Sequence, residues 1–484
     1  MADTPSAEKA TAIDWIADHR DELADLSDEI WGYAEPGLRE YDSAAALCAY
    51  LRDHGFTVKE DVAGMPTAFL ATYGEGTPVI GTFAEYDATP GDSQRPVPHE
   101  EPVHPDAAGY ADMHNGLGVG SVGAVCGLKR AMDEHGIDGT LKLFGTPAEK
   151  ITVGKPYLAR EGYYDDLDAA IAWHPRPYTT VEKGHGPSPC REFIVEFDGE
   201  SFYSAKPWHG NNALDATTLM RNTISFARQR FDPKKFASIS DMTAKGGAHP
   251  TSLPGETQSW ITTRAIDLET LDRVEDVLRR CSQAAATVTG CDVDVRITSA
   301  VRPWLNNEAL ADLAYENLQL VGPPSFTDAD KAFGREILEN LGDEPMTNPY
   351  DETLTDPDSD PTSDFLGGAD DVNEFCWHAP TCRIYVAYQF RQHYERGYPS
   401  WASAALAKTN VAHEALTTAA KAMAGTAMDL LTEPATLEAA QSEFQSKTAD
   451  RSIDPLLPPE ATPPTEESIP PFYPEGWEPP VNVG

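Results

Sequence analysis

The N-terminal part of the chain alternates between helical and strand-like patterns of hydrophobic residues. Apolar residues recur at helical spacing through residues 9–56, and Gly55 ends the pattern. Short apolar runs predict strands at 68–73, 78–83, 140–144 and 168–173, and helical patterns predict helices at 116–132 and near Lys155. This alternation predicts an α/β fold with a doubly wound, mostly parallel sheet covered by helices on both faces.

The pattern changes near residue 190. Strands are predicted at 191–197, 256–266 and 291–299, with amphipathic helices at 213–230 and 268–288. This order is typical of a small inserted α+β domain of the ferredoxin-like type. The prediction divides the chain into a main domain in two parts, an inserted domain and a proline-rich extended tail: residues 1–189 and 303–450, residues 190–302 and residues 451–484. The second part of the main domain includes a long Ala-rich helix at 409–431.

Charge excludes several classes of partner. The chain carries 37 Lys and Arg against 78 Asp and Glu, a formal net charge of −41. Nucleic acids and anionic membranes need clustered basic residues, so neither is expected as a partner. The acidity is typical of proteins in a salt-rich cytoplasm, and an ordinary acidic protein is the alternative. No apolar run approaches the roughly 20 residues that cross a bilayer, and the N-terminus is polar, so we expect a soluble, cytoplasmic protein. An odd number of cysteines, seven, without a CxxC pair predicts reduced thiols.

Polar residues gather where the predicted strands end. Glu85 and Asp87 follow one strand, Glu149 and Lys150 follow a second, and His174 ends a third. Asp112 and His114 stand at the entrance of a predicted helix. Ligand sites of open parallel sheets lie outside the carboxyl ends of the strands. An Asp-x-His pair with a further His and a Glu supplies ligands suited to Zn²⁺ or Mn²⁺.

A glycine series follows His114. Gly118, Gly120 and Gly123 match the spacing of a dinucleotide fingerprint, but no strand precedes them, so nucleotide binding is not expected. Together with Gly116 and Gly127 they predict a small-residue face that packs a helix closely on the sheet.

Several segments, in order, resemble the zinc peptidase–amidohydrolase family (peptidase family M-twenty), and within it the aminobenzoyl-glutamate hydrolase branch. The resemblance extends over nearly the whole chain. Its motifs are Ile30-Trp31 with Glu35 to Glu40, Glu85 to Gly91 with Ser93-Gln94, Gly145 to Glu149, Trp173 to Pro175, Pro207-Trp208 with Gly210 and Ala213 to Ala216, and Val411 to Leu416 leading to Asp429 to Pro434. It implies a metal-dependent hydrolytic site and a lid, residues 190–302, that forms a homodimer. We expect exposed strand edges such as 191–197 to pair across the dimer axis.

The resemblance assigns roles by position. Glu149 matches the general base, His114 and His174 match metal ligands, and Asp112 stands where this branch has Cys. Other positions depart from the pattern. Lys150 replaces a ligand Glu, and Pro399 replaces a late ligand His unless His393 substitutes for it. Phe202 replaces the lid His that polarises the scissile carbonyl, with His209 nearby, and Thr251 replaces an Asn that holds the substrate carboxylate.

An ammonium in place of a carboxylate disfavours a second cation. We therefore expect one divalent ion per protomer, Zn or Mn, held by Asp112, His114 and His174, with His393 or water as a further ligand. Glu85 and Asp87 are expected to contact substrate or to orient the ligand imidazoles.

The function expected from these residues is hydrolysis of a C–N amide bond in a small N-acyl or aromatic amide. Glu149 would take a proton from water activated by the metal, and Lys150 would either stabilise the developing oxyanion or only pair with Glu149. One alternative is a deaminating aminohydrolase that acts on an aromatic amine. Another is a catalytically inactive relative that binds a small molecule. A third is an aminopeptidase-like enzyme in which Glu85, Asp87 and Asp92 bind a free amino terminus.

Overall fold

The computed structural model describes residues 4–105, 107–184, 186–344, 346–359, 368–393 and 397–465. The sheet of its main body contains, within these residues, β1 (Thr57–Glu60), β2 (Phe69–Glu75), β3 (Val79–Ala84), β6 (Gly139–Gly145), β7 (Ala169–Arg176), β8 (Thr180–Val181) and β13 (Thr381–Ala387). The strand order is β1-β2-β6-β3-β7-β13-β8. Strands β6, β3, β7 and β13 are parallel, and β1, β2 and β8 pair antiparallel toward the edges. Two further strands, β4 (Thr89–Pro90) and β5 (Ala108–Gly109), form a separate pair. The predicted mostly parallel α/β sheet is therefore confirmed.

Helices cover both faces of this sheet. The α-helices of the main body are α1 (Ala7–Asp18), α2 (Arg20–Tyr33), α3 (Tyr41–Asp53), α4 (His114–His135), α5 (Gly154–Arg160), α8 (Glu308–Val321), α9 (Asp328–Asn340), α11 (Ser400–Ala404), α12 (Asn410–Thr432) and α13 (Pro434–Thr448). Short 3₁₀ turns are η1 (Val62–Gly64), η2 (Glu149–Ile151), η5 (Pro357–Ser359) and η6 (Asp371–Trp377). Helices α4 and α12 pack on one face, and α1 and α2 pack outside α4. On the other face, Phe83 and Phe144 contact Phe375 of η6. No helix among the described residues combines the length and the apolar character that crossing a membrane requires.

The glycines of α4 bring this helix close to its neighbours. A Cβ on Gly118 would lie 2.6 Å from the Glu85 carbonyl oxygen, and one on Gly120 would lie 2.8 Å from the Trp173 ring. Gly127 faces α1 in the same way, at 2.8 Å from a backbone oxygen. The predicted close packing on the sheet is confirmed for Gly118 and Gly120, whereas Gly116, Gly123 and Gly127 face neighbouring helices or the start of α4 itself.

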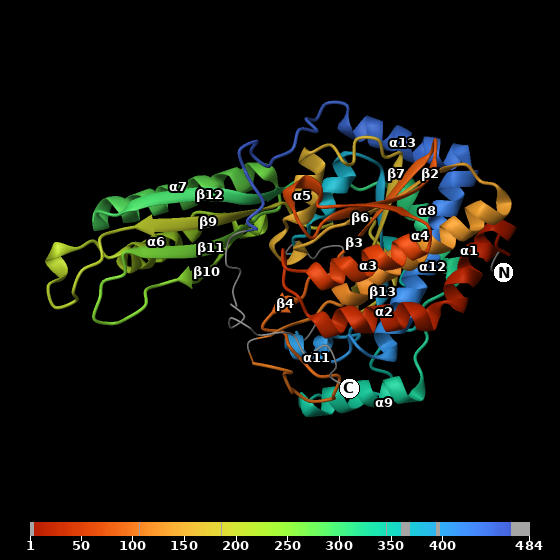
Figure 1. The fold of residues 1–484 in the computed structure, drawn as a ribbon, viewed down its shortest axis with the longest axis horizontal. Helices are drawn as coiled ribbons and strands as arrows, with labels where there is room; N and C mark the ends of the chain where they lie inside the picture. Colours follow the sequence, from red (N-terminus) through yellow and green to blue (C-terminus); the bar gives the residue numbers. More distant parts are fainter. Residues whose placement is uncertain are drawn as a thin grey trace.

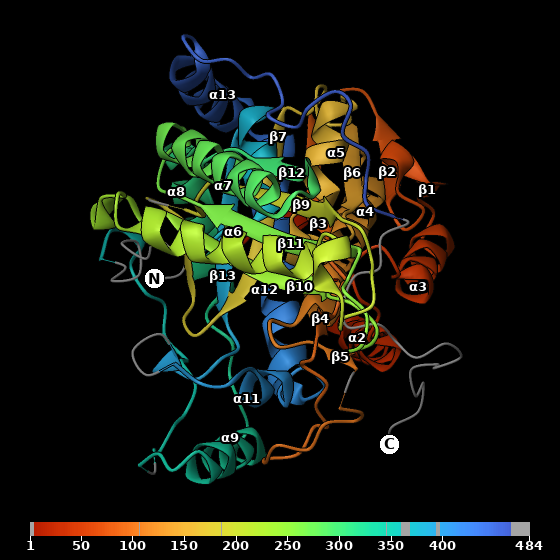
Figure 2. The ribbon, with the colours of Figure 1, turned by 90° about the vertical axis from the view of Figure 1, so that its left-hand side faces the viewer.

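A second sheet projects from one side of the main body (green in Figure 1). It consists of β9 (Cys190–Asp198), β10 (Ser238–Lys245), β11 (Glu256–Arg264) and β12 (Asp292–Val301), with α6 (Ala213–Arg228), α7 (Leu268–Thr289) and the short turns η3 (Pro207–His209) and η4 (Pro233–Lys235). The order β10-β11-β9-β12 with antiparallel pairing is that of a ferredoxin-like domain. Helices α6 and α7 pack against each other and against this sheet (Figure 2).

Two details of this domain differ from the sequence prediction. Strand β10 was not predicted, because one residue of its eight, Ile239, is buried, so its hydrophobic alternation is weak. The strand predicted at 191–197 is β9, which pairs on both sides, with β11 and with β12. The expectation that β9 offers an exposed edge is wrong, and the edges of this sheet are β10 and β12.

The junction between the two sheets is tied by a buried ion pair. Arg302 directly follows β12, its side chain is 2% exposed, and its guanidinium donates to Glu374 Oε2 at 2.6 and 3.0 Å. It also donates to the carbonyl oxygen of Ile453 in the C-terminal segment. The C-terminal segment continues over the surface. Its Leu457 is buried, and the Arg160 guanidinium donates to the carbonyl oxygens of Pro458 and Ala461. This part of the predicted proline-rich tail is extended chain; residues 466–484 lie outside the described residues.

We predict that Arg302→Met lowers the free energy of unfolding by about 3–5 kcal/mol, because it leaves the Glu374 carboxylate buried without a partner. The double variant Arg302→Met/Glu374→Leu should recover most of this loss, since no charge then stays buried alone. Urea unfolding followed by circular dichroism measures both. A double variant no more stable than the single one would show that the ion pair itself supplies the stability.

Candidate active site

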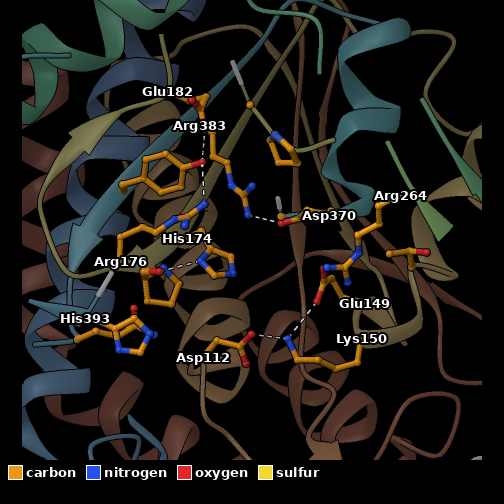
Figure 3. Close-up of a pocket in the computed structure, with 18 of the residues that line it drawn as sticks. Asp112, Glu149, Lys150, His174, Arg176, Glu182, Arg264, Asp370, Arg383 and His393 are labelled. Atoms are coloured by element: carbon orange, nitrogen blue, oxygen red, sulfur yellow. Dashed lines mark hydrogen bonds and ion pairs between the residues drawn. The ribbon is translucent and has the colours of Figure 1, made fainter. Parts of the chain in front are cut away.

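The carboxyl ends of the parallel strands bring the predicted residues together (Figure 3). Glu85 and Asp87 follow β3. Glu149, which follows β6, and His174, which lies in β7, are labelled in Figure 3. A cavity of about 330 Å³ opens here, and its walls include Asp112, Glu149, Lys150, His174 and His393. Parallel strands end at the same edge, so residues distant in sequence share one crevice.

Two imidazoles are oriented through their Nδ1 atoms. His114 donates from Nδ1 to Asp87 Oδ1 at 2.8 Å, and His174 donates from Nδ1 to the Pro175 carbonyl oxygen at 2.8 Å. A carboxylate oxygen and a carbonyl oxygen can only accept, so each imidazole carries a proton on Nδ1. The Nε2 atom of each ring therefore remains to bind another partner. Burial, together with Arg383 and Arg176, lowers the pKa of His174 well below its usual value, so this ring is neutral. For His114, burial and Lys150 lower the pKa, but Asp112, Glu85 and Asp87 outweigh them and raise it to about 9.

The donor set fits a cation. A ring nitrogen of His114, a ring nitrogen of His174 and an oxygen of Glu85 all lie within 4.8 Å of one another. Glu85 is fully buried, and its Oε2 makes no hydrogen bond, at 3.3 Å from His114 Nε2. Two oriented imidazoles beside a buried carboxylate oxygen are ligands suited to a transition metal.

The ammonium of Lys150 stands among these groups. Its Nζ donates to Asp112 Oδ2 at 2.5 Å and to Glu149 Oε2 at 3.1 Å, and it lies 3.2 Å from His114 Nε2. Burial alone would raise the pKa of Asp112, but the positive charge of Lys150, and that of His114 when protonated, hold it well below its usual range. Asp112 is thus an anion already paired with a cation of the chain.

Glu149 has the environment of a general base. Burial, opposed by Lys150 and reinforced by Asp370 and Glu85, raises its pKa to about 7. Its position is fixed by an unusual backbone: Ala148 has a φ of 59° directly before Glu149, as Met113 has a φ of 61° directly before His114. Residues other than glycine adopt such angles at a cost of about 1–3 kcal/mol, and they cluster at functional sites. Ala148 is held by its N–H, which donates to the buried Glu40 at 2.8 Å.

A second group of charges lies behind the first and was not predicted. The fully buried Lys155 donates to Glu85 Oε1 at 2.6 Å and to Asp371 Oδ1. The neighbouring Asp370 accepts from Arg383, whose side chain lines the cavity. Asp370 and Asp371 form an acidic pair like those at the ends of the other strands. This pair comes before the buried strand β13 and does not follow a strand, so the strand-end pattern did not select it.

The lid residues singled out from the sequence lie elsewhere. His209 is in η3, and Thr251 Oγ1 lies 2.8 Å from His249 Nδ1, both in loops beyond the ends of β9 and β11 that point away from the main body. The cavity lies at the other end, where Arg264 lines it. Eight residue steps of β9, at about 3.3 Å each, separate the two ends by roughly 26 Å. Within one chain, His209 and Thr251 therefore do not reach Glu149.

His393 lies on the cavity wall, as its predicted role as a further ligand requires. Burial and the charge of Arg176 lower the pKa of its imidazole.

Comparison with known proteins gives relatives that match along nearly the whole chain, although no family model matches it. The chain is 28% identical over 475 residues to one of the p-aminobenzoyl-glutamate hydrolase subunits of Escherichia coli, in a match that covers 93% of this chain and 97% of that protein. It is 25% identical to the Xaa-Arg dipeptidase of Mus musculus, over 92% of this chain and 94% of that one.

Two solved structures share the fold. A dinuclear metal-binding peptidase of the M-twenty family from Bacillus subtilis has a TM-score of 0.52 at 17% identity and covers 86% of this chain and 99% of its own. An aminobenzoyl-glutamate utilisation protein from Klebsiella pneumoniae has a TM-score of 0.53 at 15% identity and covers 83% and 97%. These matches agree with the resemblance carried by the motifs: the chain is similar over nearly its whole length to a p-aminobenzoyl-glutamate hydrolase subunit, and it shares the fold of an M-twenty peptidase.

Proposed function

We propose that the protein is a metal-dependent hydrolase that cleaves the C–N bond of a small N-acyl or aromatic amide. The observation that carries the proposal is a buried carboxylate with a raised pKa, Glu149, which shares one cavity with the oriented His174 and lies 3.7 Å from Nε2 of the oriented His114. The relatives are named for p-aminobenzoyl-glutamate, Xaa-Arg dipeptides, N-acetyl-L-cysteine and hippurate, all of which contain an amide bond.

His114 and His174 are the proposed protein ligands of one divalent ion, Zn or Mn. When bound, such an ion lowers the pKa of water and polarises a carbonyl oxygen. Asp112 is the carboxylate ligand predicted from the sequence, and its Oδ2 lies 4.0 Å from His114 Nε2.

The chain's own residues carry the proton chemistry. With a pKa of about 7, Glu149 accepts a proton from water near neutral pH and passes it to the leaving nitrogen. Asp87 keeps the His114 ring in one tautomer and orientation. Lys150, 3.1 Å from Glu149, places a positive charge where an oxyanion would develop, as well as pairing with Asp112.

The far wall of the cavity suits an anionic substrate end. Arg176 and Arg383 rise from β7 and β13, and Arg264 reaches the cavity from the end of β11 (Figure 3). Guanidinium groups bind carboxylates through paired N–H donors. We therefore expect the substrate to carry a carboxylate, as an N-acyl amino acid does.

We predict that Glu149→Gln keeps the fold and the metal while turnover falls by about 10²–10⁴-fold, because the amide preserves shape and removes proton transfer. In the wild type, kcat/KM should fall below about pH 7, where Glu149 becomes protonated. Amine release from N-acyl amino acids and aryl amides measures turnover. Full activity of the variant would refute the assigned base, whereas loss of metal would make Glu149 a ligand.

Lys150 offers a test of the ion count. We predict that the wild type binds one equivalent of Zn²⁺ by calorimetry and that Lys150→Glu binds a second, because the change replaces a repelling charge with a ligand carboxylate. Lys150→Gln is the matched control and should still bind one. Two equivalents in the wild type would contradict the proposal, as would no binding.

We also propose that residues 190–302 act as a lid that forms a homodimer. Strand β10 is an edge of the lid sheet, with Met242 43% exposed, and Phe226 on α6 is 72% exposed. An unpaired edge flanked by apolar side chains is suited to isologous pairing across a two-fold axis.

The dimer should be seen by light scattering in high salt, where screening reduces the repulsion between chains of charge −41. A proline at Thr243 in β10 should produce a monomer, because it removes a pairing N–H from the edge. A folded wild-type monomer in high salt would exclude the proposed assembly.

A further inference from the structure

We propose that Glu85, held in place by Lys155, is the carboxylate ligand of the metal site, in the role that the sequence assigns to Asp112. The inference rests on the proposed metal-dependent function and specifies how this chain builds the site. It explains why a chain with Lys150 at a ligand position keeps two oriented imidazoles.

The first argument is the state of the Glu85 carboxylate. Its side chain has no solvent exposure, and Oε1 accepts from Lys155 Nζ at 2.6 Å. The other oxygen, Oε2, makes no hydrogen bond and faces His114 Nε2. A buried carboxylate oxygen without a hydrogen-bond partner is costly. A protonated His114 Nε2 at 3.3 Å offsets this cost in the metal-free protein, and a cation bound between the two atoms would take the place of that proton.

The second argument is the spacing of the donors. Two ligands about 2.0–2.1 Å from a tetrahedral zinc ion lie about 3.4 Å apart. Glu85 Oε2 lies 3.3 Å from His114 Nε2, and a ring nitrogen of His174 is within 4.8 Å of both. The corresponding separation from His114 Nε2 is 3.7 Å for Glu149 and 4.0 Å for Asp112.

The third argument is that Asp112 is already neutralised. Its Oδ2 accepts from Lys150 at 2.5 Å, and its side chain is 32% exposed, so it has both a partner and access to water. Glu85 has no solvent access, and its second oxygen is directed at the imidazoles. The pair Asp112–Lys150 thus forms one wall of the site and leaves Glu85 to complete the ligand set.

Lys155 acts as the positioning residue. Its ammonium lies between Glu85 and Asp371, 4.4 Å from the centre of the Phe83 ring. The backbone N–H of Lys155 also donates to Asp371 Oδ2, at 3.1 Å. Lys155 therefore fixes one oxygen of the buried Glu85 carboxylate and leaves the other directed at His114. Such a neighbour orients a ligand and tunes its affinity for the metal.

The test is the affinity of chelator-stripped protein for Zn²⁺, measured by competition with a chromophoric chelator. Glu85→Gln should weaken Zn²⁺ binding by at least about 100-fold. Loss of a residue that only supports a ligand costs up to about 100-fold, so a larger loss indicates a direct ligand. Asp112→Asn should weaken it by less than tenfold. Asp371 also accepts from Lys155 but does not face the imidazoles. Asp371→Asn is therefore the matched control, and its affinity for Zn²⁺ should also stay within tenfold of the wild-type value. Circular dichroism checks the fold of each variant.

Wild-type affinity in a folded Glu85→Gln variant, or a larger loss in Asp112→Asn, would overturn this inference and leave the proposed hydrolase intact. Absence of Zn²⁺ binding by the wild type would overturn both. Crystals of the wild type soaked in Zn²⁺ give an answer independent of folding defects. The anomalous peak should lie within about 2.2 Å of Glu85 Oε2, and a peak coordinated by Asp112 in its place would refute the assignment.

Discussion

The candidate site depends on the neutralisation of buried carboxylates by two lysines. Lys150 pairs with Asp112 and Glu149, and Lys155 pairs with Glu85 and Asp371. Without these ammonium groups, the acidic residues at the ends of β3 and β6 would repel one another in a region of low dielectric. Lys150 lowers the pKa of both Asp112 and Glu149, and Lys155 holds one oxygen of Glu85.

This arrangement is also the basis for proposing one metal ion and not two. The B. subtilis structure with the same fold is described as a dinuclear metal-binding peptidase. Here an ammonium, Lys150, lies 3.2 Å from His114 Nε2 and is bonded to Asp112. A fixed positive charge at this place supplies part of the electrostatic stabilisation that a second cation would give, without needing a ligand set of its own. In the proposed one-metal site, the ammonium of Lys150 would stand in for a second ion.

The sequence was sufficient to predict the residues that follow strands. Glu85, Asp87, Glu149 and His174 stand directly after or within short apolar runs, and the ends of parallel strands must meet. The resemblance to a family added roles for His114 and Glu149, which spacing alone could not assign. Even the glycines of α4 were informative, because small residues at helical spacing indicate close packing.

The partners that tune these residues could not be predicted. Lys155 and Asp371 are 216 positions apart, and neither lies in a motif whose pattern announces a charge pair. Strand β13 does carry a short apolar run, Ile384 to Tyr388, but nothing in the sequence indicates that Arg383 within it pairs with Asp370. His209 and Thr251 were assigned to the site because they match or neighbour positions of the family pattern. Such a match does not show how far a residue lies from Glu149 within one chain. Tertiary structure alone brings such residues together or keeps them apart.

The central claim is that one metal ion and Glu149 together cleave an amide bond. The most direct measurement is amide cleavage by chelator-treated protein as Zn²⁺ or Mn²⁺ is added back, with an aminobenzoyl or acyl amino acid as substrate. The account predicts no activity without metal and a linear rise that reaches its plateau at one equivalent per chain. Activity that is independent of added metal, or a plateau at two equivalents, would contradict it.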